Sequence, residues 1–166
     1  MLKRTGKLEK ILNEMNIDGI FMTDLYNLRY FTGFTGTTGV ALATRKGNFF
    51  FSDFRYRTQA EKQVSIMGFE FVEVARGSLH KIGEYAQKFG IDKIGFEDRN
   101  VTVALYNTIK DILKGEMIPV GDNLIMERMV KTTEEIEKIK KAVEISDTAF
   151  SEVLKIIKEG VSEKEI

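Results

Sequence analysis

Hydrophobic residues recur along the chain with two periods, which predict alternating helices and strands. Apolar side chains at positions 8, 11, 12 and 15 have the spacing of one helix face. Short apolar runs such as residues 20–22 predict buried strands instead. From these patterns we expect helices over 8–15, 54–64, 78–89 and 101–113, and strands over 20–22, 40–43, 48–51, 69–74, 94–96 and 116–120.

The order of these elements indicates an α/β sandwich. Arg45-Lys46-Gly47 is a short connection between two apolar runs, so residues 40–51 are expected to form an antiparallel hairpin. The other strands are separated by helices, which favours a mixed sheet covered on both faces. The sequence therefore predicts a three-layer α/β sandwich over residues 1–122, ending with a turn at Gly121-Asp122-Asn123.

Residues 123–166 have a different character, dominated by a long charged helix. Ile136, Val143, Phe150 and Ile157 are seven positions apart and define one apolar face. We expect the helix to start after Thr132 or Thr133, which are suitable caps, and to end at Gly160. Ser162 is expected to open another helix whose first turn is unfinished at Ile166. This pattern predicts that the chain is the front of a longer polypeptide.

Composition and charge exclude several classes of function. The 166 residues are 43% hydrophobic and 30% charged, with 25 basic and 25 acidic residues, as in an ordinary soluble domain with no net field to attract nucleic acid or a membrane. The absence of cysteine and the single histidine, His80, exclude thiolate sites and any site that needs two imidazoles from this chain. No window resembles a signal peptide or a membrane span, so we expect a cytoplasmic protein.

Residues 27–39 are the most unusual segment, with aromatic residues between regularly spaced glycines. Gly33, Gly36 and Gly39 form a G-x-x-G-x-x-G run, a pattern that can cradle phosphate when a helix follows it. Here a strand is expected to follow, which disfavours phosphate binding. The segment is better interpreted as a tight loop, shaped by glycine and pinned by its aromatic side chains.

Acidic residues near the predicted strand ends suggest a second, weaker hypothesis. Asp53 directly follows a strand, where it is most simply a helix cap rather than a phosphoacceptor. Five carboxylates lie close to strand ends and would suit a two-metal nuclease if they met: Asp24, Asp53, Asp92, Glu97 and Asp98. The neutral chain offers no basic stripe to hold a nucleic acid, which disfavours this hypothesis.

Several segments, in the same order, resemble the creatinase/prolidase/aminopeptidase P family. Residues 27–34 (NLRYFTGF), 53–56 (DFRY) with Gln59-Ala60, and 94–97 (IGFE) are similar to the N-terminal domain of that family. Residues 127–136 (ERMVKTTEEI), Ala142 and residues 160–166 (GVSEKEI) resemble its linker and the opening helices of its pita-bread catalytic domain. The resemblance covers essentially the whole chain and divides it into residues 1–122 and 123–166.

The resemblance implies a cytoplasmic metallopeptidase that cleaves short proline-containing peptides, either an Xaa-Pro aminopeptidase or an Xaa-Pro dipeptidase. In this family two divalent metals, often manganese or cobalt, are held by two Asp, one His and two Glu of the pita-bread domain and activate a bridging water. None of these ligands can be placed in residues 1–166, so the resemblance implies a chain that has no metal site and is inactive by itself.

The resemblance also implies what the N-terminal domain does. In the family it is an α/β sandwich with a ribonuclease-H-like sheet that contributes to a homodimer or larger assembly and restricts access to the active site. The candidate substrate-gating residues are Asn27, Tyr30, Phe34, Arg55 and Tyr56. Tyr30 and Phe34 are expected to contact substrate and Arg55 to pair with a peptide carboxylate. Alternatively, Tyr30 and Arg55 are packed and ion-paired residues that shape the loop.

Three other functions stay open at the level of sequence. The chain is compatible with the front domain of a creatinase-type amidinohydrolase, because no residue here separates amidinohydrolases from peptidases. A ribonuclease-H-like nuclease predicts cleavage of nucleic acid that depends on Asp53 or Glu97. A stand-alone dimerisation module predicts a gene that ends at Ile166.

Overall fold

The computed structural model describes residues 4–166, and its centre is one mixed six-stranded sheet with the strand order β4-β3-β2-β1-β5-β6. The strands are β1 (Gly19–Met22), β2 (Val40–Thr44), β3 (Gly47–Ser52), β4 (Glu70–Glu73), β5 (Lys93–Phe96) and β6 (Glu116–Pro119). β2 is antiparallel to β1 and to β3, and every other neighbouring pair is parallel. The expected β2–β3 hairpin and the mixed sheet are confirmed.

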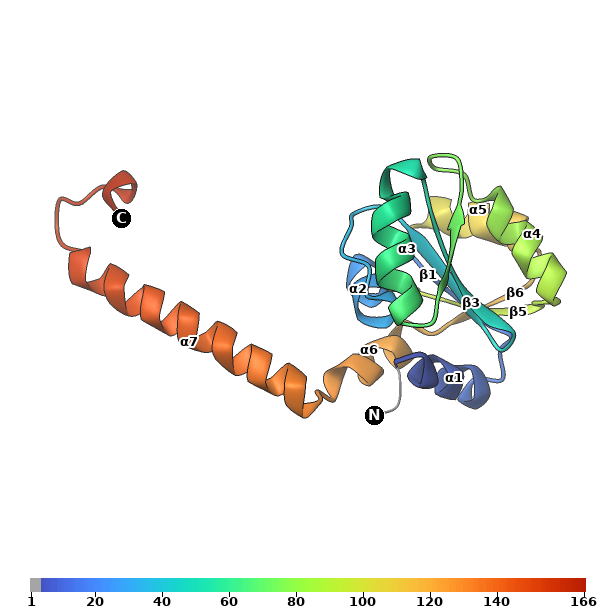
Figure 1. Cartoon of the computed structure of the whole chain (residues 1–166), viewed down its shortest axis with the longest axis horizontal. Helices are drawn as coiled ribbons and strands as arrows, with labels where there is room; N and C mark the ends of the chain where they lie inside the picture. The colour runs from blue at the N-terminus through green and yellow to red at the C-terminus, as the bar shows by residue number, and fades with distance from the viewer. Residues whose placement is uncertain (1–3) are drawn as a thin grey trace. The chain divides into compact units, whose positions relative to one another are not determined.

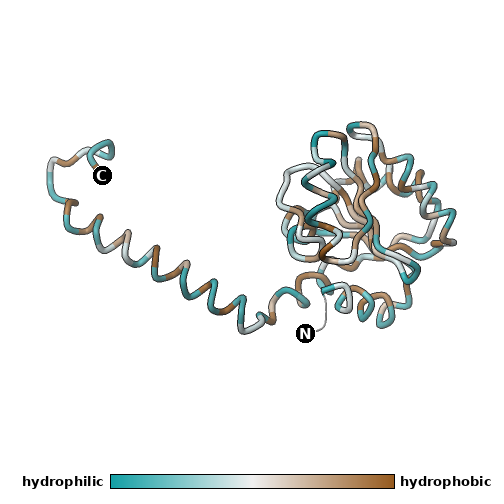
Figure 2. The backbone as a smooth tube through the Cα atoms, in the orientation of Figure 1, coloured by the Kyte–Doolittle hydropathy of each residue, from teal (hydrophilic) through white to brown (hydrophobic). Residues whose placement is uncertain are grey.

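Helices cover both faces of this sheet (Figure 1). The helices are α1 (Arg4–Glu14), α2 (Leu25–Thr32), α3 (Arg57–Ile66), α4 (His80–Phe89), α5 (Val103–Leu113) and α6 (Gly121–Met129), with a 3-10 helix η1 (Phe54–Tyr56) before α3. Ile20 and Met22 of β1 pack with α1, α2 and α3, whereas Phe21 packs with α4 and α5. Because successive strand side chains point to opposite faces, one sheet supplies two cores. The predicted three-layer sandwich is confirmed, and the apolar strands run through its interior (Figure 2).

The prediction of a loop over residues 27–39 was wrong for its first part, because residues 25–32 form α2. Asp24 caps this helix, its Oδ2 accepting a hydrogen bond from the Asn27 backbone N–H at 3.0 Å. Leu28 and Phe31 are spaced as one helix face and are buried, which supplies the burial that a short helix needs. Gly33, with φ 73°, ends α2 in the left-handed conformation that glycine adopts without strain. The loop is therefore residues 33–39.

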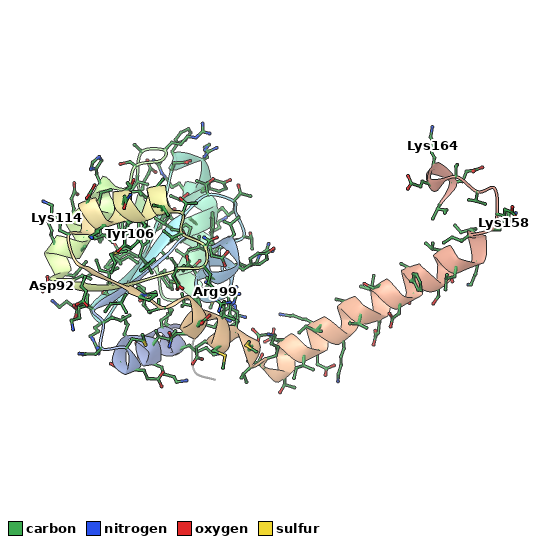
Figure 3. All side chains as sticks on the ribbon, turned by 180° about the vertical axis from the view of Figure 1, so that it is seen from behind. Asp92, Arg99, Tyr106, Lys114, Lys158 and Lys164 are labelled. Atoms are coloured by element: carbon green, nitrogen blue, oxygen red, sulfur yellow. The ribbon has the colours of Figure 1, made fainter. Side chains whose placement is uncertain are left out.

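Other element boundaries also differ from the sequence-based expectation. The helix expected over 54–64 is η1 followed by α3, and Asp53 caps η1 as predicted. Ser78 does not cap α4, which begins at His80. The turn expected at 121–123 is the first turn of α6, where the Gly121 N–H donates to Asp98 Oδ1 at 2.9 Å. Arg99, labelled in Figure 3, also pairs with Asp122 at 2.7 Å, so the loop after β5 holds the start of α6.

The chain divides into two compact units, Met1–Arg128 and Met129–Ile166. The second unit consists of the helix α7 (Thr133–Ile156) and the 3-10 helix η2 (Glu163–Glu165). Thr132 and Glu135 form a capping box at the start of α7, which ends before Gly160 rather than at it. None of the residues of α7 is buried within the chain. Among residues 4–166, no helix has the length and apolar character required to cross a membrane.

Candidate functional site

The carboxyl ends of five strands meet at one edge of the sheet. β2 is antiparallel to both of its neighbours, so β1, β3, β4, β5 and β6 all run in the same direction. In open α/β sheets the loops after such strand ends are the usual position of binding residues. Of the sequence-based candidates, Asn27 follows β1, and Arg55 and Tyr56 follow β3. The candidate site is this edge together with the loop 33–39.

At this edge, the Glu97 carboxylate, which follows β5, binds the residues that follow β1. The Glu97 side chain, 2% exposed, accepts hydrogen bonds from the backbone N–H groups of Thr23 at 2.5 Å and Asp24 at 2.8 Å. Its other oxygen accepts from Asn27 Nδ2 at 2.7 Å. Burial raises the pKa of Glu97, although these hydrogen bonds oppose the shift. Asn27 is therefore occupied in fixing the turn from β1 to α2, and it is buried rather than open to a ligand.

Tyr30 lies among α1, α2 and α6. Lys7 Nζ donates to the Tyr30 hydroxyl at 2.8 Å, and that hydroxyl donates to the Glu127 carbonyl oxygen at 3.3 Å. The Arg4 guanidinium lies 4.4 Å from the centre of the Tyr30 ring. Tyr30 is therefore packed and hydrogen-bonded within the fold, which corresponds to the second interpretation given from the sequence, a residue that shapes the structure rather than one that contacts substrate.

Phe34 of the loop 33–39 comes together with Arg55 and Tyr56 of η1. The Phe34 ring, 1% exposed, lies 4.5 Å from the Phe50 ring and 5.4 Å from the Tyr56 ring, measured between centroids. The Arg55 guanidinium carbon lies 5.5 Å from the Tyr56 ring centre. Phe34 is a core residue that supports Tyr56, so its ring is not at the surface of the chain.

Asp53 holds the Arg55 guanidinium in a fixed orientation. Arg55 Nε donates to Asp53 Oδ1 and Nη2 donates to Oδ2, each at 2.8 Å, while the Arg55 backbone N–H also donates to Oδ1 at 3.1 Å. This bidentate pair lowers the pKa of Asp53, whose side chain is buried. The Arg55 side chain is 40% exposed, and the N–H groups on Nη1 have no partner among the described residues. These donors are suited to a carboxylate.

The five carboxylates considered for a two-metal nuclease do not form one site. In residues 4–166, no group of three or more Asp, Glu or His side chains is placed to hold a metal ion. Glu97 binds backbone N–H groups, Asp53 binds Arg55, and Asp98 accepts from Gly121. Each of these three carboxylates has a local partner, so they are not gathered into one group as the two-metal hypothesis expects.

Sequence reasoning missed the partners that hold the candidate residues in place. Thr37 contacts Tyr56, Gln63 contacts Thr35, and Lys7 and Glu127 contact Tyr30. Each contact joins residues at least 19 positions apart, so local periodicity contains no signal for it. Local signals exist only for the two caps: Asp53 was predicted from its position after a strand, and Asp24 could have been, since it precedes an apolar helical face.

The chain is similar to a known family and to solved structures. The Creatinase/Prolidase N-terminal domain model matches residues 4–130. The uncharacterized peptidase YqhT of Bacillus subtilis is 36% identical over 161 residues, which are 95% of this chain and 45% of that protein. An Xaa-Pro dipeptidase from Bacillus anthracis has a TM-score of 0.90 and 36% identity, covering 99% of this chain and 46% of its own.

A third similarity concerns a protein solved as the N-terminal domain alone. The N-terminal domain of the cytoplasmic peptidase PepQ from Mycobacterium tuberculosis has a TM-score of 0.66 and 27% identity, covering 75% of this chain and 97% of its own. The chain thus spans less than half the length of YqhT and of the Bacillus anthracis enzyme, but about the whole length of an isolated N-terminal domain.

Proposed function

Because this chain belongs to the Creatinase/Prolidase N-terminal domain family, we propose that it is the N-terminal domain of a proline-specific metallopeptidase, either an Xaa-Pro aminopeptidase or an Xaa-Pro dipeptidase. The observation that carries the proposal is the similarity to the Bacillus anthracis Xaa-Pro dipeptidase over 99% of this chain. That similarity covers 46% of the other protein, so in this proposal catalysis belongs to residues outside the 166 of this chain.

The two divalent metals of such an enzyme, manganese or cobalt, do not fit the residues of this chain. Residues 4–166 contain no cluster of three carboxylate or imidazole side chains, so no catalytic step is assigned to them. In the proposal this chain is inactive by itself and acts in the cytoplasm. The similarity to the cytoplasmic peptidase PepQ supports that location.

We place the join between the two parts of the chain within α6. The sequence-based boundary after Asp122 lies at the start of this helix, whereas the family match extends to residue 130 at its end. Residues 123–166 then form a linker and the first helices of the catalytic domain. The exposed apolar face of α7, which includes Ile136, Val143 and Phe150, agrees with this assignment.

The proposed role of the N-terminal domain is assembly and substrate gating. In a homodimer or larger assembly, the edge that carries Arg55 and Tyr56 would line the active-site entrance of a neighbouring subunit. Arg55 is then the group that binds the carboxylate of a short peptide, through the N–H groups that Asp53 leaves free. Asn27, Tyr30 and Phe34 support this edge from within the fold.

Substitution of Arg55 tests the gating role in the longer gene product. Arg55→Ala removes a charge-assisted hydrogen bond to the peptide, which contributes about 1.5–3 kcal/mol, so KM for an Xaa-Pro dipeptide should rise about 10- to 100-fold with kcat little changed. Arg55→Lys should have a KM between those of the wild type and Arg55→Ala, because lysine keeps the positive charge but lacks the planar guanidinium that binds a carboxylate through two hydrogen bonds. Arg57→Ala is the control for loss of a neighbouring positive charge, since the Arg57 guanidinium pairs with Glu73 at 2.5 Å and has no role in the proposed carboxylate binding. Unchanged peptide kinetics in Arg55→Ala would remove Arg55 from the site.

A further inference from the structure

The loop 33–39 is attached to the segment that follows β3. The Thr35 backbone N–H donates to Gln63 Oε1 at 3.0 Å, and the Thr35 hydroxyl accepts from Gln59 Nε2 at 3.0 Å and Gln63 Nε2 at 2.9 Å. Gln59 and Gln63 are both on α3. At its end, the loop is held by the Ser52 hydroxyl, which donates to the Thr38 carbonyl oxygen at 2.6 Å. These contacts fix the two sides of the loop.

Tyr56 holds the middle of the loop. Its hydroxyl and the Thr37 hydroxyl are 2.8 Å apart, within hydrogen-bond distance. Hydrogen bonds from Thr37 and Thr38 lower the pKa of the Tyr56 phenol, in agreement with donors directed at its oxygen. The side chain of Thr37 is otherwise exposed, so Tyr56 is its principal anchor.

The loop also lies in close contact with the Tyr56 ring. A Cβ atom added to Gly36 would be 2.3 Å from the Phe34 ring and 2.8 Å from the Tyr56 ring, closer than real Cβ atoms approach. Phe34 in turn packs on Phe50 of β3. The Phe34 ring is buried, so it cannot shift without disturbing the packing of the core. The Gly36 backbone lies against both rings, so its position depends on that of the Tyr56 ring.

Tyr56 is itself fixed by its neighbour Arg55. The bidentate pair with Asp53 anchors η1 to the end of β3, and the Arg55 guanidinium lies over the Tyr56 ring. The same short helix therefore carries the proposed carboxylate-binding group and the anchor of the loop. Both groups therefore depend on the same attachment of η1 to Asp53.

From these contacts we infer that Tyr56 and Thr37 form a latch that sets the position of the loop 33–39, and that Tyr56 selects peptides by length through this loop rather than by contact. Tyr56 is then a positioning residue and not a catalytic one. The existence of the latch is independent of the proposed function, but its effect on peptides rests on the gating role proposed for this domain.

Hydrogen exchange in the loop tests the latch on the chain itself. Tyr56→Phe and Thr37→Val each remove one hydroxyl of the pair, and amide exchange in residues 34–38 should become about 3- to 10-fold faster in either variant. The double variant should be no faster than Tyr56→Phe alone, because removal of the Tyr56 hydroxyl already removes its interaction with Thr37. Thr37→Ser keeps the hydroxyl and should exchange like the wild type. Tyr26→Phe is the matched control, since Tyr26 is 75% exposed on α2. Unchanged exchange in Tyr56→Phe, or additive effects in the double variant, would overturn the latch.

Peptide kinetics in the longer gene product test what the latch does. For Tyr56→Phe and Thr37→Val, the ratio of kcat/KM between an Xaa-Pro dipeptide and an Xaa-Pro pentapeptide should change at least about 3-fold in the same direction. Tyr26→Phe and Thr37→Ser should keep the wild-type ratio. If loop exchange becomes faster but the ratio of kcat/KM values stays unchanged, selection by length is overturned, whereas the proposed Xaa-Pro peptidase function is not. Absence of Xaa-Pro hydrolysis in the wild type would instead overturn the proposed function, and loop exchange would still decide the latch.

Discussion

At the scale of single residues, Glu97 shows how an ionisable group is used to fix a turn. Its carboxylate accepts two backbone N–H groups after β1 and one amide N–H from Asn27. Burial nevertheless outweighs these hydrogen bonds and raises its pKa. The Asn27 Oδ1 atom has no hydrogen-bond partner in the described part of the chain. A protonated or amide group at position 97 would supply one after rotation of the Asn27 amide.

This arrangement predicts a pH-dependent contribution to stability. A glutamate whose pKa is raised on folding stabilises the fold fully below its unfolded pKa, about 4.3, and loses that contribution as the pH rises through the higher folded value. The free energy of unfolding of the wild type relative to Glu97→Gln should therefore be larger at pH 4 than at pH 7, as measured by urea denaturation. Gln87→Ala, an exposed change that does not titrate, should show a constant difference. A difference for Glu97→Gln that stays flat or grows with pH would contradict the raised pKa.

Glu97→Ala tests how much the hydrogen bonds of Glu97 contribute to the stability of the fold. This change leaves buried N–H groups without acceptors, so it should lower the free energy of unfolding by at least about 2 kcal/mol relative to Glu97→Gln. The amide introduced by Glu97→Gln can still accept from the backbone N–H groups and donate to Asn27, which makes the pair of variants a measure of hydrogen bonding rather than of volume alone. Equal stabilities for the two variants would show that the hydrogen bonds of Glu97 contribute nothing.

At the scale of elements, the sequence predicts most of the sandwich but not all of its helices. The six strands and the helices α1, α3, α4 and α5 follow from apolar periodicity, since their buried positions are regular. α2 was missed because its aromatic residues lead directly into the glycine-rich residues 33–39, which indicate a loop, and its apolar helical face is only Leu28 and Phe31. α6 was missed because Asp98 and Arg99, distant in sequence, hold its first turn. For the candidate residues Arg55 and Tyr56, the sequence predicts that Asp53 caps the helix that carries them, whereas the Asp53–Arg55 pair and the Thr37–Tyr56 contact required the fold.

The close approach of α4 and α5 gives a prediction at this scale. A Cβ atom on Gly83 would lie 2.7 Å from an Ile112 side-chain carbon and 2.9 Å from the Ile112 carbonyl oxygen. Gly→Ala normally stabilises a helix by about 1 kcal/mol, but here the backbone of α5 is in the way. Gly83→Ala should therefore lower the free energy of unfolding by about 1–3 kcal/mol. Gln87→Ala on the exposed side of α4 should change it by less than about 0.5 kcal/mol. A stabilised Gly83→Ala variant would mean that the two helices do not touch at this point.

At the scale of the whole molecule, the chain combines the N-terminal fold of its family with a helix whose apolar residues are exposed. The family match covers residues 4–130, and α7 begins at Thr133. The chain covers 46% of the Bacillus anthracis enzyme that it resembles, and the described residues contain no group of three side chains placed to hold a metal ion. We propose that this chain serves an Xaa-Pro metallopeptidase without performing the reaction itself.

The most direct test is a side-by-side assay of residues 1–166 and the longest product of the same gene, each with Mn²⁺ or Co²⁺. The substrates are an Xaa-Pro dipeptide, an Xaa-Pro tripeptide, the same peptides with alanine in place of proline, and creatine. We predict that the longer protein cleaves only the proline peptides, and that residues 1–166 cleave none of the substrates. Cleavage of creatine without cleavage of Xaa-Pro bonds, or peptide cleavage by residues 1–166 alone, would contradict this account.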